Sequence, residues 1–145
     1  MNEKWISIIA TLVLVAAVVA LGLHRGLIAT GPVSALLQIA GLLLVVWARL
    51  TFGIRSFHAA ANPTRGPLIT TGPYRYIRNP IYAAALLICW TGVAVHWSAV
   101  NALLGLLILA TLMVRIRCEE KLLKQVYPEY GEYARNTARL IPHIV

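Results

Sequence analysis

Residues 81–115 read IYAAALLICWTGVAVHWSAVNALLGLLILATLMVR and hold two apolar runs separated by His96-Trp97-Ser98. Apart from His96, no side chain in the stretch is charged or titrates near neutral pH before Arg115. Each run is long enough to cross about 30 Å of hydrocarbon as a helix. The three-residue break leaves room only for a tight turn. The stretch therefore predicts a hairpin of two membrane helices, 81–97 and 98–115.

Two further apolar runs, 5–23 and 32–53, precede this hairpin. The chain is 59% hydrophobic and only 12% charged, far from the balance of a water-soluble globule. The first run is longer than the apolar core of a signal peptide, so we interpret it as an uncleaved helix. We predict an all-α integral membrane protein with four transmembrane helices in a single membrane domain, 1–145.

Net charge of +8 would suit nucleic-acid binding, but the position of the charges excludes that partner. Twelve of the thirteen basic residues fall on one side of the predicted helices and only Arg25 on the other. The positive-inside rule then predicts a multi-pass protein in the lipid bilayer with both termini cytoplasmic. The loop 54–80 and the C-terminal segment 117–145 lie on the same side.

The loop between the second and third helices is stiffened by four proline pairs, Asn62-Pro63, Gly66-Pro67, Gly72-Pro73 and Asn79-Pro80. A loop fixed at so many points is suited to holding a shape. The alternative is a cytoplasmic linker whose arginines contact lipid phosphates. We expect the loop and the C-terminal helical segment to form a pocket on the cytoplasmic face.

Charged residues follow the fourth helix in the string RIRCEEKLL, 115–123. Arg115 and Glu119 are four apart, which places them on one helical face at the water boundary, either as a structural ion pair or as part of a site. The pattern predicts that the helix continues to about Val126, where Pro128 stops it, and that a short helix follows through 130–138.

The strings GPYRYIRNPIY, RIRCEEKLL and YGEYARNTARLIP, in this order around a helical hairpin, resemble the isoprenylcysteine carboxyl methyltransferase family and its phospholipid methyltransferase relatives. That family carries a Gly-x-Tyr-x-x-x-Arg-His-Pro-x-Tyr segment, a Glu-Glu pair and a Tyr-x-x-Tyr tail. The resemblance runs from about Arg49 to Pro142. Asn79 stands where the family usually has His, which keeps a hydrogen-bonding side chain but removes a titratable one.

The resemblance implies an S-adenosylmethionine-dependent methyltransferase, with S-adenosylhomocysteine as product. It implies that the cofactor is held by Gly66, Pro67, Leu68, Ile69, Tyr74, Asn79, Pro80, Ile81, Tyr82 and Glu119. It assigns Arg115, as the catalytic residue, and Arg139 to a lipophilic acceptor, which for this family is the carboxylate of an isoprenylcysteine. Such a nucleophile is already ionised and needs positioning rather than a general base.

Several alternatives stay open. A lipid amine as acceptor would need to lose a proton, for which Glu120 is a candidate base. Outside enzymes, a small four-helix transporter or a catalytically inactive scaffold would also fit the size, although no charge lies in the middle of a predicted helix as a transporter would need. The scattered histidines predict no metal site, and a homodimer is possible.

Overall fold

The computed structural model describes residues 3–53 and 67–141, and these are mainly helical. In chain order the elements are α1 (Glu3–Leu23), α2 (Pro32–Phe52), the 3-10 helix η2 (Gly72–Arg75), α3 (Pro80–Val95), α4 (Ala99–Val126) and α5 (Tyr130–Asn136). The all-α prediction is confirmed. The continuation of the fourth helix to Val126 and the short helix after it are both present.

The helices α1, α2 and α4 are each long and apolar enough to cross a bilayer, which confirms a membrane protein. The third predicted span is shorter than expected, because α3 has 16 residues and a length of about 24 Å. His96 and Trp97 form the turn, and the Ser98 side chain caps α4 by accepting from Asn101 N at 3.1 Å. A membrane crossing by α3 stays a prediction.

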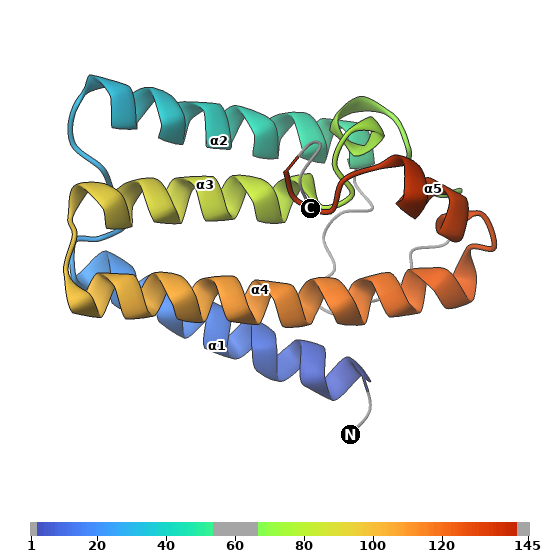
Figure 1. The fold of residues 1–145 in the computed structure, drawn as a ribbon, viewed down its shortest axis with the longest axis horizontal. Helices are drawn as coiled ribbons and strands as arrows, with labels where there is room; N and C mark the ends of the chain where they lie inside the picture. Colours follow the sequence, from blue (N-terminus) through green and yellow to red (C-terminus); the bar gives the residue numbers. More distant parts are fainter. Residues whose placement is uncertain (1–2, 54–66, 142–145) are drawn as a thin grey trace.

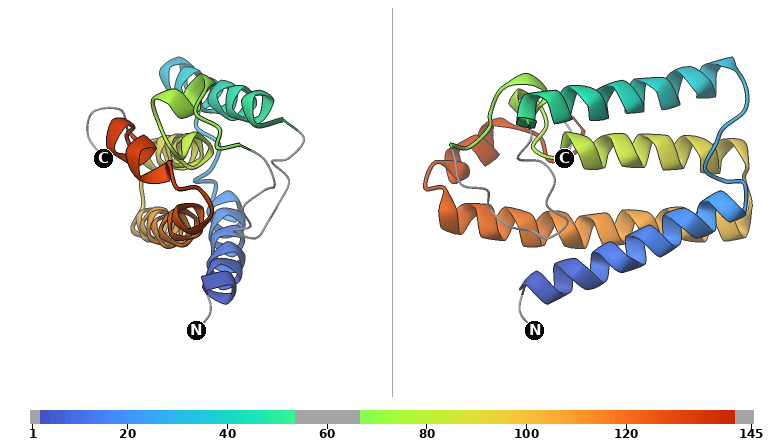
Figure 2. Two further views of the ribbon diagram at one scale, coloured as in Figure 1. Left: turned by 90° about the vertical axis from the view of Figure 1, so that its right-hand side faces the viewer. Right: turned by 180° about the vertical axis from the view of Figure 1, so that it is seen from behind.

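Figures 1 and 2 show α2, α3 and α4 running side by side, with α1 crossing α4 at an angle. The pairs in contact are α1 with α4, α2 with α3, and α3 with α4. Fully buried Leu21 of α1, Val93 of α3 and Leu112 of α4 belong to one apolar core. The helices α1, α3 and α4 therefore share a core, while α2 packs on the outer side of α3.

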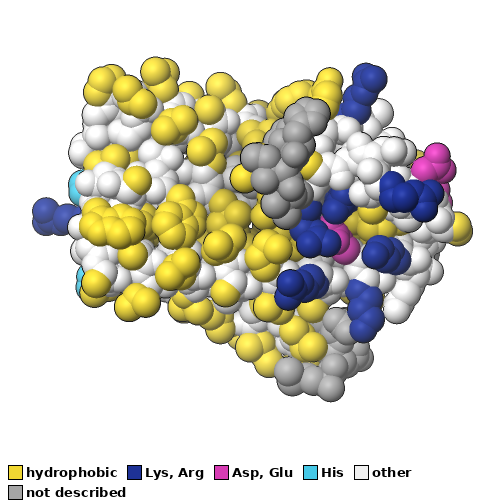
Figure 3. Space-filling view, viewed as in Figure 1, with side chains coloured by type: hydrophobic (Ala, Val, Ile, Leu, Met, Phe, Trp, Pro, Cys, Tyr) yellow, Lys and Arg dark blue, Asp and Glu magenta, His cyan; other side chains and the backbone are white. Residues whose placement is uncertain are grey.

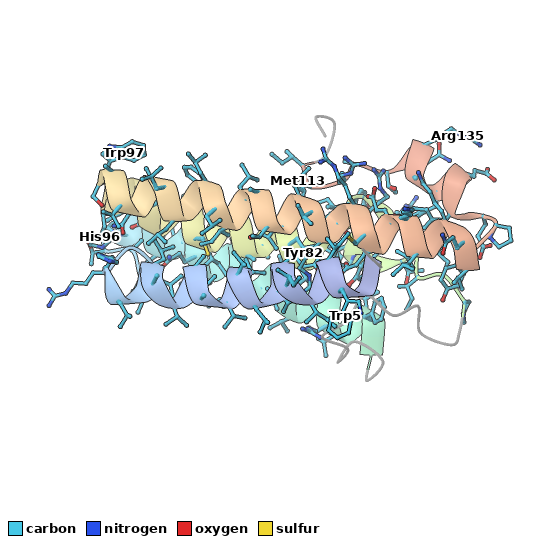
Figure 4. All side chains as sticks on the ribbon, turned by 90° about the horizontal axis from the view of Figure 1, so that it is seen from below. Trp5, Tyr82, His96, Trp97, Met113 and Arg135 are labelled. Atoms are coloured by element: carbon cyan, nitrogen blue, oxygen red, sulfur yellow. The ribbon has the colours of Figure 1, made fainter. Side chains whose placement is uncertain are left out.

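The surface divides into an apolar body and one charged end (Figure 3). Large apolar side chains such as Leu42 and Leu43 of α2 are 57% and 64% exposed, an arrangement that suits lipid and not water. Lys, Arg and acidic side chains gather where α5 and the last turns of α4 lie. We call the end of the molecule formed by α5 and the last turns of α4 the basic end. Figure 4 places His96 and Trp97 at the opposite end and Arg135 at the basic end.

Backbone atoms approach closely where α3 passes the α1–α2 connection. A Cβ added at Gly92 would lie 2.6 Å from the Leu27 carbonyl oxygen and closer still to that of Gly26. Beside this contact, Gln38 of α2 donates to the carbonyls of Leu27 at 2.7 Å and Ile88 at 3.1 Å. The absence of a side chain at Gly92 therefore lets α3 pack directly on backbone.

Gly92→Ala should lower the free energy of unfolding by about 1–3 kcal/mol, because backbone atoms cannot move aside as a flexible side chain can. Gly22→Ala is the matched control, since its Cβ would meet only Leu27 Cδ2 at an ordinary 3.8 Å. Thermal unfolding in detergent measures both. Equal stability of the two variants would contradict the close approach.

Candidate functional site

An ion pair in the second half of α4 reaches α3. Arg115 Nη2 and Glu119 Oε1 lie 3.0 Å apart, and their side chains are 9% and 24% exposed. Tyr82, in the first turn of α3, donates its hydroxyl to the same Glu119 oxygen at 2.5 Å. The Arg115 guanidinium carbon also lies 5.6 Å from the centre of the Tyr82 ring. The predicted Arg115–Glu119 pair is thus present and Tyr82 is joined to it.

The neighbouring carboxylate, Glu120, faces a different set of partners and is only 6% exposed. Arg78 Nε lies 3.1 Å from its Oε1, and Arg139 Nη2 lies 3.0 Å from its Oε2. The Asn79 amide donates to Glu120 Oε1 at 3.4 Å and to the Arg139 carbonyl at 3.2 Å. Successive residues on a helix point in different directions, so Glu119 and Glu120 serve two separate clusters.

Backbone pairing fastens the loop before α3 to the segment after α5. Ile77 and Ala138 form an isolated parallel bridge, in which Arg78 N donates to the Ala138 carbonyl at 2.8 Å and Ala138 N donates to the Tyr76 carbonyl at 3.1 Å. Arg78 Nη1 adds a 2.6 Å bond to the Ala134 carbonyl of α5. This pairing, together with the ion pair between Arg139 and Glu120, fixes the segment after α5 against α4 and the loop before α3.

Tyr74, in η2, is buried and contacts residues of both α5 and α2. Its carbonyl accepts from the Tyr133 hydroxyl at 2.7 Å, and its ring lies 5.7 Å from that of Phe52. Burial raises the pKa of the Tyr74 phenol to about 12, an effect that the Arg49 guanidinium opposes and the Glu119 carboxylate increases. Tyr74 thus joins η2 to α5 and to the end of α2.

The predicted cofactor residues are only partly gathered. Tyr74, Asn79, Pro80, Tyr82 and Glu119 come together at the basic end. Pro67, Leu68 and Ile69 lie before η2 in a stretch without regular secondary structure, and Gly66 lies outside the described residues. Ile81 occupies the first turn of α3. The cofactor role of these residues stays a prediction, and so does the acceptor role of Arg115 and Arg139.

Sequence reasoning assigned no role to three residues that the structure brings into these clusters: Arg78, Tyr133 and Thr11. Arg78 could have been singled out, because it stands in the Pro-rich string next to Asn79. No pattern pointed to Thr11 of α1, whose hydroxyl oxygen accepts from Arg115 Nη1. That contact joins residues 104 positions apart and exists only in the folded chain.

A second feature is a groove of about 580 Å³ between α2 and α3 at the end opposite these clusters. Its lining includes Leu37, Leu87 and Trp90 and is mainly apolar. Such a surface offers lipid chains a place but supplies few groups for a polar cofactor. The groove is therefore separate from the candidate site.

The sequence model of the phospholipid methyltransferase family matches residues 30–130. The chain is 37% identical over 78 residues to the cobalt-zinc-cadmium resistance protein CzcN of Cupriavidus metallidurans, a match that covers 53% of this chain and 36% of that protein. It is 33% identical over 78 residues to the nickel-cobalt-cadmium resistance protein NccN of Alcaligenes xylosoxydans xylosoxydans, covering 53% and 37%. The matched part is thus little more than a third of either relative. No solved structure matches the chain.

Glu120→Gln should lower the free energy of unfolding by roughly 3–5 kcal/mol, because it leaves the buried guanidinium of Arg78 without its counter-charge. Glu132→Gln, which changes an exposed carboxylate of α5 in the same way, should have little effect. Thermal unfolding of both variants in detergent provides the test. A Glu120 variant as stable as the Glu132 variant would rule out the proposed ion-pair cluster.

High pH should loosen the contact between η2 and α5. Burial is the main cause that raises the pKa of both Tyr74 and Tyr133 to about 12, above the value of about 10 for an unfolded chain. The folded state therefore favours the neutral phenols, and their contribution to stability is complete below about pH 10 and is lost as the pH rises through about 12.

Phenolate absorbance during an alkaline titration measures this effect. Tyr74→Phe and Tyr133→Phe should each remove a phenol that titrates late, near pH 12. Loss of a phenol that titrates near pH 10 in either variant would contradict the burial of that side chain.

Proposed function

Since the chain belongs to the phospholipid methyltransferase family, which indicates a membrane methyltransferase, we propose that it transfers a methyl group from S-adenosylmethionine to a lipophilic acceptor. The observation that carries the proposal is the half-buried Glu119 carboxylate, held between Tyr82 and Arg115 where the apolar surface ends. A polar cofactor and a lipid-borne acceptor can both reach such a position.

The chemistry of the residues near Glu119 fits S-adenosylmethionine. Glu119 offers a carboxylate to the ammonium group or the ribose hydroxyls, and the Tyr74 ring offers an aromatic face. The stretch 67–69 and the Asn79–Tyr82 turn would offer backbone groups to the remaining polar atoms. The bound cofactor supplies an electrophilic methyl group on a sulfonium.

The role we propose for Arg115 is to bind the acceptor. A guanidinium suits a carboxylate because it can donate two parallel hydrogen bonds. Its position at the last apolar turn of α4 would let an acceptor arrive from the lipid with its head group at the charged boundary. This arrangement favours an ionised acid such as an isoprenylcysteine, whose oxygen attacks without losing a proton.

A lipid amine is the second candidate acceptor, and the description of the matched family favours it. An amine needs a group that removes its proton. Both oxygens of Glu120 are engaged by Arg78 and Arg139, so we do not assign this task to Glu120. We also propose that the basic end faces the cytoplasm, because basic residues favour that side of a membrane.

The names of the two relatives refer to resistance to metal ions, but the described part of this chain contains no cluster of three or more His, Cys, Asp or Glu that could hold a metal. We therefore propose no metal as substrate or cofactor. The relatives extend well beyond the matched region, and their activity is not transferred to this chain.

Calorimetric titration of S-adenosylmethionine and S-adenosylhomocysteine into the full chain in detergent tests the cofactor. We expect both to bind, and Glu119→Gln to weaken binding by about tenfold or more, the size of a lost charged hydrogen bond. Glu132→Gln should bind as the wild type does. A folded wild-type protein that binds neither ligand would overturn the methyltransferase proposal.

A further inference from the structure

The first helix, α1, lies outside residues 30–130, the part that matches the family, yet it contacts the candidate site. Thr11, near the middle of α1, accepts a hydrogen bond from Arg115 Nη1. Figure 4 shows α1 and α4 side by side. The site therefore includes a residue from an element to which the family match assigns nothing.

The Thr11 hydroxyl is fixed as an acceptor toward Arg115. Its single proton is donated to the Ser7 carbonyl at 2.7 Å, one turn earlier in α1. The oxygen of the hydroxyl then faces the guanidinium with its lone pairs. A β-branched threonine side chain has few rotamers in a helix. The hydroxyl is therefore held in place both by its hydrogen bond to the Ser7 carbonyl and by the restricted rotation of the side chain.

Three helices hold the Arg115 guanidinium from different sides. Thr11 of α1 contacts Nη1, Glu119 of α4 contacts Nη2 at 3.0 Å, and the ring of Tyr82 of α3 lies 5.6 Å from the guanidinium carbon. Arg115 is 7% exposed. A long arginine side chain loses considerable rotamer freedom when fixed this way, and a binding site benefits when that loss occurs before the ligand arrives.

We propose that Thr11 is a positioning residue that orients Arg115 to bind the anionic head group of the methyl acceptor, which makes α1 part of the acceptor site. This inference rests on the proposed function, which assigns Arg115 to the acceptor. Thr11 sets the plane of the guanidinium, while Glu119 contacts the other terminal nitrogen from the cofactor side. Removing the Thr11 hydroxyl should weaken recognition of the acceptor's charge and leave the cofactor's affinity unchanged.

Two probes, one with an ionised head group and one with a neutral head group, can measure this recognition: N-acetyl-S-farnesylcysteine and its methyl ester. Binding of each to the full chain in detergent is measured with saturating S-adenosylhomocysteine and without it. The wild type should bind the acid about tenfold more tightly than the ester, the expected effect of a charged hydrogen bond. Thr11→Val keeps the shape of the side chain and should lose most of this preference, whereas Thr11→Ser should keep it.

Thr91→Val is the matched control. Thr91 of α3 also donates to the carbonyl four residues earlier, at 2.6 Å, but it lies in the groove at the opposite end. This variant should keep the preference for the acid. If the acid is methylated, Thr11→Val should raise the KM for the acid severalfold and leave the KM for S-adenosylmethionine as it was. A purely structural role for Thr11 would lower thermal stability without this split.

The outcomes separate the two proposals. A Thr11→Val protein that still prefers the acid, or a wild type that does not prefer it, overturns the positioning role while cofactor binding stands on its own. A wild type that binds no S-adenosylhomocysteine overturns the methyltransferase proposal. The preference measured without cofactor then still decides whether Thr11 orients Arg115 toward an anion.

Discussion

Glu120 is buried at the water-side end of α4 and accepts charged hydrogen bonds from Arg78 and Arg139, which lie 42 and 19 positions away in the chain. A buried carboxylate is tolerated only when it is paired in this way. The pairing fixes the segment before α3 and the segment after α5 against α4. With these segments in place, Ile77 and Ala138 form their backbone bridge. The same arrangement brings the Tyr133 hydroxyl to the Tyr74 carbonyl.

The adjacent residue, Glu119, shows the opposite arrangement, and the difference bears on function. Its side chain is 24% exposed and is reached from α3 by Tyr82 and from within α4 by Arg115. Glu120 thus stabilises the packing of the segments at this end, while Glu119 beside it stays partly exposed. The 28 residues of α4 are enough to carry both carboxylates past its long apolar stretch, to the level at which α3 begins.

Short connections place Tyr82, Arg115 and Glu119 at the same end of the molecule. The turn between α3 and α4 brings Tyr82, near the start of one helix, beside Arg115 and Glu119, near the end of the other. The helix α1 crosses α4, and Thr11 near its middle contacts Arg115 (Figure 2). Residues from α1, α3 and α4 therefore meet around the Arg115 guanidinium.

The sequence by itself determined the all-α membrane class, the helix positions and the Arg115–Glu119 pair, because hydrophobic run length and helical spacing are local properties. The sequence-based prediction ended the third helix at residue 97, two residues after its actual end at Val95. The reason is that the turn residues His96 and Trp97 carry no charge that would distinguish them from the helix before them. Only the tertiary structure decided that Arg78 and Arg139 converge on Glu120 and that Thr11 reaches Arg115. Those contacts join distant segments through packing, and no local pattern encodes the distance between two side chains that far apart in the chain.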